Sequence, residues 1–553
     1  MRVKKYIVSF IIFLFPFMIG MMSQTVHAET ALLSPKKVLF VYDSLRKDNL
    51  EVEQNIHSLE RLLSSMQYQV TSESMNEYKA GQIKKEKYDA VITMINWAQM
   101  PLINETFIKD RDAYHGKKLH IGPKLTKIEK GNFPNQWDTL YQQECRIVDS
   151  HKYYDEIIGL KKELEVPIDV SEDASYPAYL DIDRGKGKRD SYPFGLHYKN
   201  NAYLPFYSDE GATFLASSEL IAEWLGIKKS YNPYIAILGF SPLSNMKIAE
   251  KFAEKIKTIE NDVILSAAST STNNDLQTFK VYVSILKEFT EGNKVVVYLN
   301  VPALNNVGDT NNQLLNVMTQ EVSAFIEDEI FPLGISAPAY WNFDTFYQNS
   351  ALNFADATLL YEFDKTPVYH TRTTQALAYP LMFYNIDHKQ LENVNWHING
   401  KYTDFTFAMP TTISYNFPTS TKEMNREIKQ ILNDPFPPTD SYLYHFDTGV
   451  STQTQNIRGK NGVITLNDTP VNNINFNQLK ERHDKIEKNT KKMKKQASTT
   501  VEKTMMNKLN DVLVGVIVFT LIILIILLVI GRQFYLRMFK DSKKSDQKKE
   551  TKK

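Results

Sequence analysis

Short apolar runs alternate with helical patterns over residues 37–135. The runs at 38–42, 89–94 and 119–122 surround a segment, 50–66, whose apolar residues recur at helical spacing. Continuous apolar runs are typical of parallel strands buried on both faces, and helices between them indicate βαβ units. The pattern predicts a flavodoxin-like or Rossmann-like domain over 37–135. Because it contains no GxGxxG, a dinucleotide site is not expected there.

Residues 136–230 follow a different pattern, in which aromatic and polar residues alternate. The stretches 179–183 and 194–198 read as short antiparallel strands, and they precede a helical segment at 217–225. This pattern predicts a small β-rich insert over 136–230.

The longest regular pattern occupies residues 231–474. Seven apolar runs alternate with helical segments at 245–259, 275–289, 313–328 and 422–432; the runs are 235–240, 263–267, 295–300, 333–338, 357–363, 381–385 and 442–446. Repeated strand–helix alternation indicates a parallel sheet, and seven repeats favour a closed (β/α)7 barrel. The segment 393–417 reads as an extra β excursion.

Both ends of the chain carry membrane-targeting patterns. Residues 512–530 are apolar and uncharged, so 511–531 is predicted to be a single transmembrane helix, followed by a basic cytoplasmic tail at 532–553. Residues 1–28 read as a signal peptide, which makes Glu29 the expected first residue of the mature chain. The body is then extracellular on a cell membrane. An uncleaved N-terminal anchor is the alternative, and it leaves the body on the same side.

Composition narrows the class of protein. The chain is 42% hydrophobic and 12% aromatic, which supports packed cores, and its single cysteine, Cys145, excludes an intramolecular disulfide. A net charge of +1 gives no reason to expect nucleic acid as a partner. Charge is concentrated instead in the basic segment 475–510, which reads either as a solvated stalk or as a segment attracted to anionic wall polymer or lipid headgroups.

Candidate catalytic residues follow from the barrel prediction, because working residues of β/α barrels lie at the carboxyl ends of strands. Glu362 and Asp447 offer two carboxylates there, and His445 offers a group that titrates near neutrality. The three residues suffice for general acid–base chemistry. The alternative is that each is a satisfied residue of the barrel rim.

Aromatic residues at one predicted strand end suggest a second kind of site. Tyr340 and Trp341 offer surfaces on which sugar rings stack, and Asp344, Asn300 and Asn385 offer hydrogen bonds to hydroxyl groups. The same aromatics could equally cap the barrel core.

Metal and cofactor sites are not predicted. The histidines at 370, 388, 397 and 445 show neither HxxxH nor HExxH spacing, so no zinc is expected. No GxSxG motif indicates a serine nucleophile.

The segments 37–474 resemble a polysaccharide-deacetylase-like family of unknown function from exopolysaccharide operons of Gram-positive bacteria. The resemblance is carried by 194–226, 235–243, 331–338 with Trp341, and the order of elements. It implies a barrel that handles polysaccharide. Deacetylases of this type hold a metal with aspartates after the first strand and histidines after later ones, whereas this chain has Ser241 and Asn300 at such places. Only 442–447 is similar to the final strand with its leucine-x-histidine.

These observations favour a membrane-anchored accessory protein of exopolysaccharide (biofilm) production. Its degenerate barrel is expected to bind glycan or to scaffold synthase or export proteins, without catalysis. The alternative is an active carbohydrate esterase or glycosidase that uses Glu362, Asp447 and His445. A glycosidase needs its two carboxyl groups roughly 5 to 9 Å apart. A sensory ectodomain is disfavoured, because the tail at 532–553 is too short for an output domain.

Overall fold

The computed structural model describes residues 35–43, 50–97, 104–141, 143–160, 163–268, 276–292, 294–300, 311–350, 352–362, 373–439 and 441–474. The predicted signal peptide, stalk, transmembrane span and tail lie outside them. Within these ranges no helix is both long and apolar enough to cross a bilayer. All the described residues belong to one unit, Met1–Ile474.

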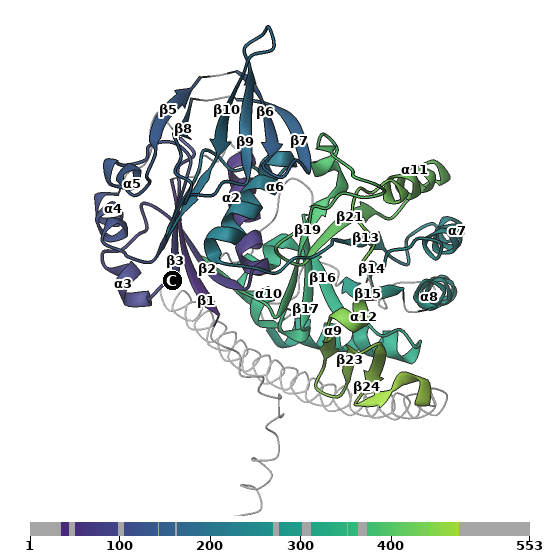
Figure 1. Ribbon diagram of the computed structural model, residues 1–553. Coiled ribbons are helices and arrows are strands. Elements are labelled where there is room, and N and C mark those ends of the chain that lie inside the picture. Colours follow the sequence, from purple (N-terminus) through teal and green to yellow (C-terminus); the bar gives the residue numbers. More distant parts are fainter. Residues whose placement is uncertain are drawn as a thin grey trace, which may run out of the picture. The chain divides into compact units, whose positions relative to one another are not determined.

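The first sheet is parallel at its centre, where Figure 1 shows β1, β2 and β3, and antiparallel at both edges. Its parallel order is β2 (Tyr68–Ser74), β1 (Lys36–Tyr42), β3 (Ala90–Met94), β4 (Lys117–Ile121) and β12 (Asn201–Leu204). This 2-1-3-4-5 order is that of flavodoxin-like sheets. The helices of this part are α2 (Leu50–Ser65), α3 (Gln82–Glu86), α4 (Glu105–Asp112) and α5 (Lys127–Gly131). The predicted parallel α/β domain is therefore present, within a mixed sheet.

The region predicted as one β-rich insert divides into two parts. Residues 136–194 form antiparallel sheets from β5 (Gln136–Leu140) with β8 (Leu164–Ile168), and from β6 (Glu144–Asp149), β7 (Tyr154–Gly159), β9 (Ala178–Asp183) and β10 (Arg189–Phe194). The chain then returns to the first sheet through β11 (Leu196–Tyr198) and β12, followed by α6 (Gly211–Leu225). The insert thus ends near 194 rather than 230, because β12 pairs with β4.

Seven parallel strands close into a barrel, as predicted. In order around it they are β13 (Tyr234–Phe240), β14 (Val263–Ala268), β15 (Val295–Asn300), β16 (Gly334–Pro338), β17 (Ala357–Tyr361), β19 (Leu381–Asp387) and β21 (Thr411–Asn416). The helices of this part are α7 (Met246–Ile256), α8 (Leu276–Thr290), α9 (Asn311–Glu327), α10 (Thr345–Ser350) and α11 (Thr421–Leu432).

One predicted barrel strand was wrong. The run 442–446 forms a short helix, α12 (Tyr442–His445), and the seventh strand is β21, which comes from the segment predicted as an excursion. Tyr442 and Leu443 of α12 are buried for another reason, whereas Tyr444 is exposed. Tyr442 plugs the amino-terminal end of the barrel, where its hydroxyl lies 2.6 Å from that of Tyr298 and its ring packs against Phe383 and Phe446.

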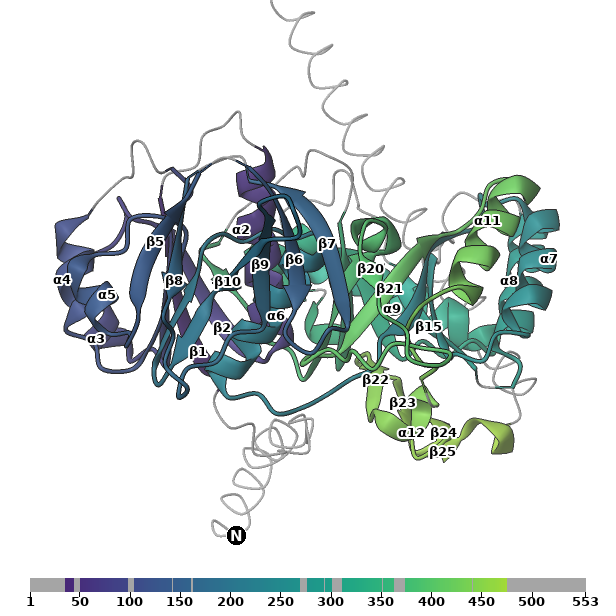
Figure 2. The same cartoon turned by 45° about the horizontal axis from the view of Figure 1, so that its top comes forward.

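Antiparallel hairpins follow α12. They comprise β22 (Thr448–Ser451), β23 (Asn456–Lys460), β24 (Val463–Leu466) and β25 (Thr469–Pro470), and Figure 2 shows them at one end of the barrel.

The chain between β17 and β19 joins the first sheet to the barrel. It supplies β18 (Gln375–Ala376), which pairs antiparallel with β2. Helix α2 also contacts both parts: Asn342, beside the barrel, donates a hydrogen bond of 3.3 Å to Ser64, and Phe343 stacks on His57. The short strand β20 (Asn395–Trp396) likewise pairs with β7 of the insert. The barrel region is therefore interleaved with both preceding regions.

Candidate functional site

The three predicted catalytic residues do not come together. Glu362 directly follows β17, at the carboxyl end of the barrel. Asp447 accepts a hydrogen bond of 2.5 Å from Arg458, which lies 3.7 Å from Asp356, the residue just before β17. The length of β17, roughly 16 Å at 3.3 Å per residue, therefore separates the two carboxylates. This span exceeds that of a glycosidase pair.

His445 lies at the same amino-terminal end as Asp447. Its Nδ1 is 3.1 Å from the hydroxyl of Tyr234, the first residue of β13. The prediction failed because it treated the segment around His445 as a strand running to the barrel mouth, whereas that segment is a helix beneath the barrel.

The predicted sugar-binding residues also divide. Trp341 is fully buried and stacks on Tyr347, with ring centroids 4.4 Å apart and planes within 9°. Asp344 is fully buried as well, and its Oδ1 accepts a hydrogen bond from the backbone of Phe346. This burial contradicts the stacking platform at Trp341 and agrees with the alternative of a capped core.

The remaining members of that set differ in their exposure. Asn385 is 9% exposed and bonds to Thr412 and Ser414 inside the barrel wall. Tyr340 and Asn300 are partly exposed, and Asn300 accepts a hydrogen bond of 3.2 Å from Tyr361.

A charged cluster that the sequence did not suggest lies at the carboxyl end of the barrel. The guanidinium of Arg61, on α2, is 2.5 Å from the Glu362 carboxylate, and the Arg61 side chain is 5% exposed against 40% for Glu362. Burial, and then the charge of Glu362, raise the pKa of Asp209 to about 6, although Arg61 acts in the opposite direction. Arg61 is therefore the cation shared by two acids. Nothing in the spacing of residues 50–66 distinguishes it from a surface arginine.

Asp209 gives a pH-dependent stability that can be measured. Its pKa is about 6 in the folded chain and 3.8 ordinarily, so the folded state favours the protonated form, and stability is lost as pH rises from about 4 through 6. Asp209→Asn removes this loss. The unfolding free energy of the variant minus that of the parent chain should therefore increase by roughly 2 to 3 kcal/mol between pH 4 and pH 8. Urea unfolding of both proteins at both pH values measures this increase. If variant and parent differ by the same free energy at pH 4 and pH 8, the pKa of Asp209 is not raised.

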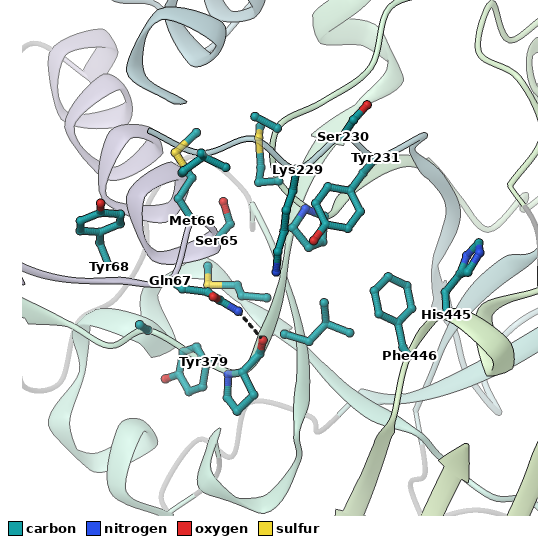
Figure 3. Close-up of a pocket in the computed structure, with 18 of the residues that line it drawn as sticks. Ser65, Met66, Gln67, Tyr68, Lys229, Ser230, Tyr231, Tyr379, His445 and Phe446 are labelled. Atoms are coloured by element: carbon teal, nitrogen blue, oxygen red, sulfur yellow. Dashed lines mark hydrogen bonds between the residues drawn. The ribbon is translucent and has the colours of Figure 1, made fainter. Parts of the chain in front are cut away.

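An open cleft of about 1230 Å³ lies at the amino-terminal end of the barrel (Figure 3). Residues of the first sheet, α2, the segment after α6 and the barrel contribute to it, and one wall is fixed by a hydrogen bond of 3.0 Å from Gln67 to the backbone of Pro380. The lining includes Lys36, Gln67, Tyr68, Lys228, Lys229, Tyr231, Asn232, Tyr379, His445, Phe446 and Asp447. Two of the predicted catalytic residues, His445 and Asp447, thus belong to this cleft.

The cleft offers aromatic and hydrogen-bonding groups, but the carboxylate of Asp447 in it is held by two cations. Tyr231 and Phe446 are partly exposed, and Lys229 is exposed with its side chain directed across the cleft in Figure 3. Asp447 is paired with Arg458 and Lys460. Burial acts to raise the pKa of Asp447, but the hydrogen bonds from these two cations lower it overall. Asp447 is therefore a poor proton donor at neutral pH.

A group of possible metal ligands lies between the insert and α6. Ligand atoms of Asp149, His151 and Glu219 all fall within 4.8 Å of one another. Burial, and then the charges of Asp149 and Glu223, raise the pKa of Glu219 to about 8. Because Glu219 is distant in the sequence from Asp149 and His151, and the three residues form no known motif, sequence patterns did not reveal them.

Comparison with known proteins gives distant structural likenesses alone. No family model and no curated protein matches the chain. Among solved structures, it is similar to a ThuA-like protein from Parabacteroides merdae, with 11% identity, over 33% of this chain and 82% of that one, at a TM-score of 0.20.

Proposed function

We propose that this chain is a membrane-anchored extracellular accessory protein of exopolysaccharide biosynthesis or export, and that it binds polysaccharide in the cleft of Figure 3. The observation that carries the proposal is the cleft itself, with its size and its aromatic and polar lining. The resemblance of the sequence to deacetylase-like proteins of exopolysaccharide operons supports polysaccharide as the ligand. The hydropathy of 511–531 supports the membrane anchor.

The dimensions of the cleft suit a polymer. Pockets for small molecules enclose about 300 to 1,000 Å³. At about 1230 Å³, and open to solvent, this cleft has room for several sugar units of a longer chain.

The lining matches the chemistry of sugars. Tyr231 and Phe446 offer aromatic surface to the CH faces of the rings, and Gln67 and Asn232 offer both donors and acceptors for hydroxyl groups. Lys228 and Lys229 add positive charge, which would favour a polysaccharide with acidic groups.

We favour a protein that only binds polysaccharide over an enzyme that hydrolyses it with Glu362, Asp447 and His445. Asp447 is held by two cations, and Glu362 lies at the far end of β17. We therefore propose that this chain shares the barrel architecture of the deacetylase-like proteins but not their hydrolytic activity.

The test compares binding of the native exopolysaccharide by variants at the two ends of the barrel. Tyr231→Ala should weaken binding about tenfold, equal to about 1.4 kcal/mol, because it removes a stacking surface. The backbone of Tyr231 is fixed by two hydrogen bonds to Phe407, so the fold should be retained. Lys229→Ala should weaken binding of an acidic polymer, and less so at high salt.

Variants at the opposite end are the controls. Tyr340→Ala and Glu362→Gln should leave affinity unchanged. If these two abolish binding while Tyr231→Ala does not, the ligand binds at the carboxyl end and the cleft assignment is wrong. Release of acetate or reducing sugar that disappears in Glu362→Gln would instead indicate an enzyme.

A further inference from the structure

Two carboxylates, one fully buried and one partly buried, lie close together across the contact between the insert and α6. Asp149 ends β6 and is 1% exposed, and Glu219 lies within α6 and is partly buried. Their ligand atoms lie within 4.8 Å of each other. Two negative charges at this distance repel strongly, because the protein interior screens them less than water does. Such a pair needs either a proton or a cation.

Several polar atoms of this cluster have no partner among the described residues. One oxygen of Asp149 accepts a hydrogen bond of 2.8 Å from the backbone of Tyr153, whereas its Oδ1 is buried and unbonded. Oε2 of Glu219 is buried and unbonded too. Buried polar groups nearly always have partners, so atoms left unpaired in this way point to a missing ligand.

The surroundings add a nitrogen donor and a hydroxyl group. His151 follows Asp149 in the turn between β6 and β7, and its exposed ring stacks on Tyr153. Tyr154 is fully buried, its hydroxyl has no partner among the described residues, and it is close enough to Glu219 and Asp149 to feel both charges. The cluster therefore combines two carboxylates and an imidazole, with a phenol beside them.

We propose that Asp149, His151 and Glu219 bind one divalent transition-metal ion, of the Zn²⁺ or Mn²⁺ type. Mixed carboxylate and imidazole ligands suit these ions, whereas Mg²⁺ and Ca²⁺ prefer oxygen alone. Three protein ligands leave positions for water. The ion would neutralise the two buried carboxylates and fix the β6–β7 turn to α6.

The test uses the full chain, purified in detergent and stripped of metal with a chelator. Titration with ZnCl₂ or MnCl₂ should give one saturable site and a rise in the melting temperature, since an ion that binds only the folded state stabilises it. Asp149→Asn, Glu219→Gln and His151→Ala should each weaken binding at least tenfold. Glu144→Gln, the same kind of change at the exposed start of β6, should bind as the parent chain does.

Measurements without metal separate loss of binding from loss of fold. Asp149→Asn and Glu219→Gln should melt at the same temperature as the metal-free parent or higher, because each relieves the repulsion. His151 is exposed, so His151→Ala should fold normally in any case. The proposal is overturned if the parent chain shows no 1:1 site, or if His151→Ala binds as tightly as the parent. Binding of Mg²⁺ as tight as that of Zn²⁺ would exclude a role for the imidazole.

Discussion

Replacing Trp341 with alanine is expected to lower the free energy of unfolding by about 3 to 5 kcal/mol, the usual cost of truncating a large buried aromatic. Trp341 is fully buried, and its ring lies parallel to that of Tyr347 at 4.4 Å. The truncation therefore removes buried area and one wall of a stacked pair, and it leaves a cavity next to β16. Urea denaturation of the two proteins measures the difference.

The neighbouring residue supplies a matched control. Tyr340 is partly exposed and meets Tyr347 edge-on rather than in a stack, so Tyr340→Ala should cost clearly less. Polysaccharide affinity of the folded Trp341→Ala protein should be unchanged. A stable Trp341→Ala protein that no longer binds glycan would restore the stacking platform that the sequence suggested.

Removing the Arg61 cation is expected to destabilise the protein by about 2 to 3 kcal/mol. Loss of one partner of a fully buried pair costs about 3 to 5 kcal/mol, and the smaller figure applies here because the Glu362 side chain is 40% exposed and can be hydrated. Arg61→Met keeps much of the buried volume while leaving Glu362 and Asp209 without their shared cation. Thermal and urea unfolding at pH 7 measure the loss.

A double-mutant cycle isolates the ion pair. Glu362→Gln alone should have a small effect, and in the Arg61→Met background it should be less destabilising or even favourable, giving a coupling of about 1 kcal/mol. Because Arg61 lowers the pKa of Asp209, Arg61→Met should also raise that pKa further. A coupling near zero would mean that Arg61 and Glu362 do not interact in solution.

Sequence patterns predicted the positions of helices and strands more reliably than which of them pair or pack together. Six of the seven predicted barrel strands are correct, because strands buried on both faces must be apolar throughout. The segment 442–446 has the aromatic and aliphatic residues of a strand but forms α12 instead. Tyr442 is buried as a plug under the barrel, with the partly exposed Phe446 packed against it, and a short apolar run gives no sign of whether it enters a sheet or closes its end.

The end of the insert also could not be found from local sequence, because it depends on which strands pair. The short stretch 201–204 is too brief to signal a parallel strand, and only its pairing with β4 assigns it to the first sheet. This pairing joins residues far apart in the sequence, so it depends on the whole arrangement rather than on local spacing.

By itself the sequence determined the strand–helix alternation and hence a parallel α/β architecture with a seven-stranded barrel, because hydrophobic periodicity is written locally in the chain. Tertiary structure alone decided which side chains meet. It placed Glu362 beside Arg61 and far from Asp447, it buried Trp341, and it brought Asp149 and Glu219 together. Such juxtapositions arise when distant elements pack, so the spacing of residues along the chain carries no record of them.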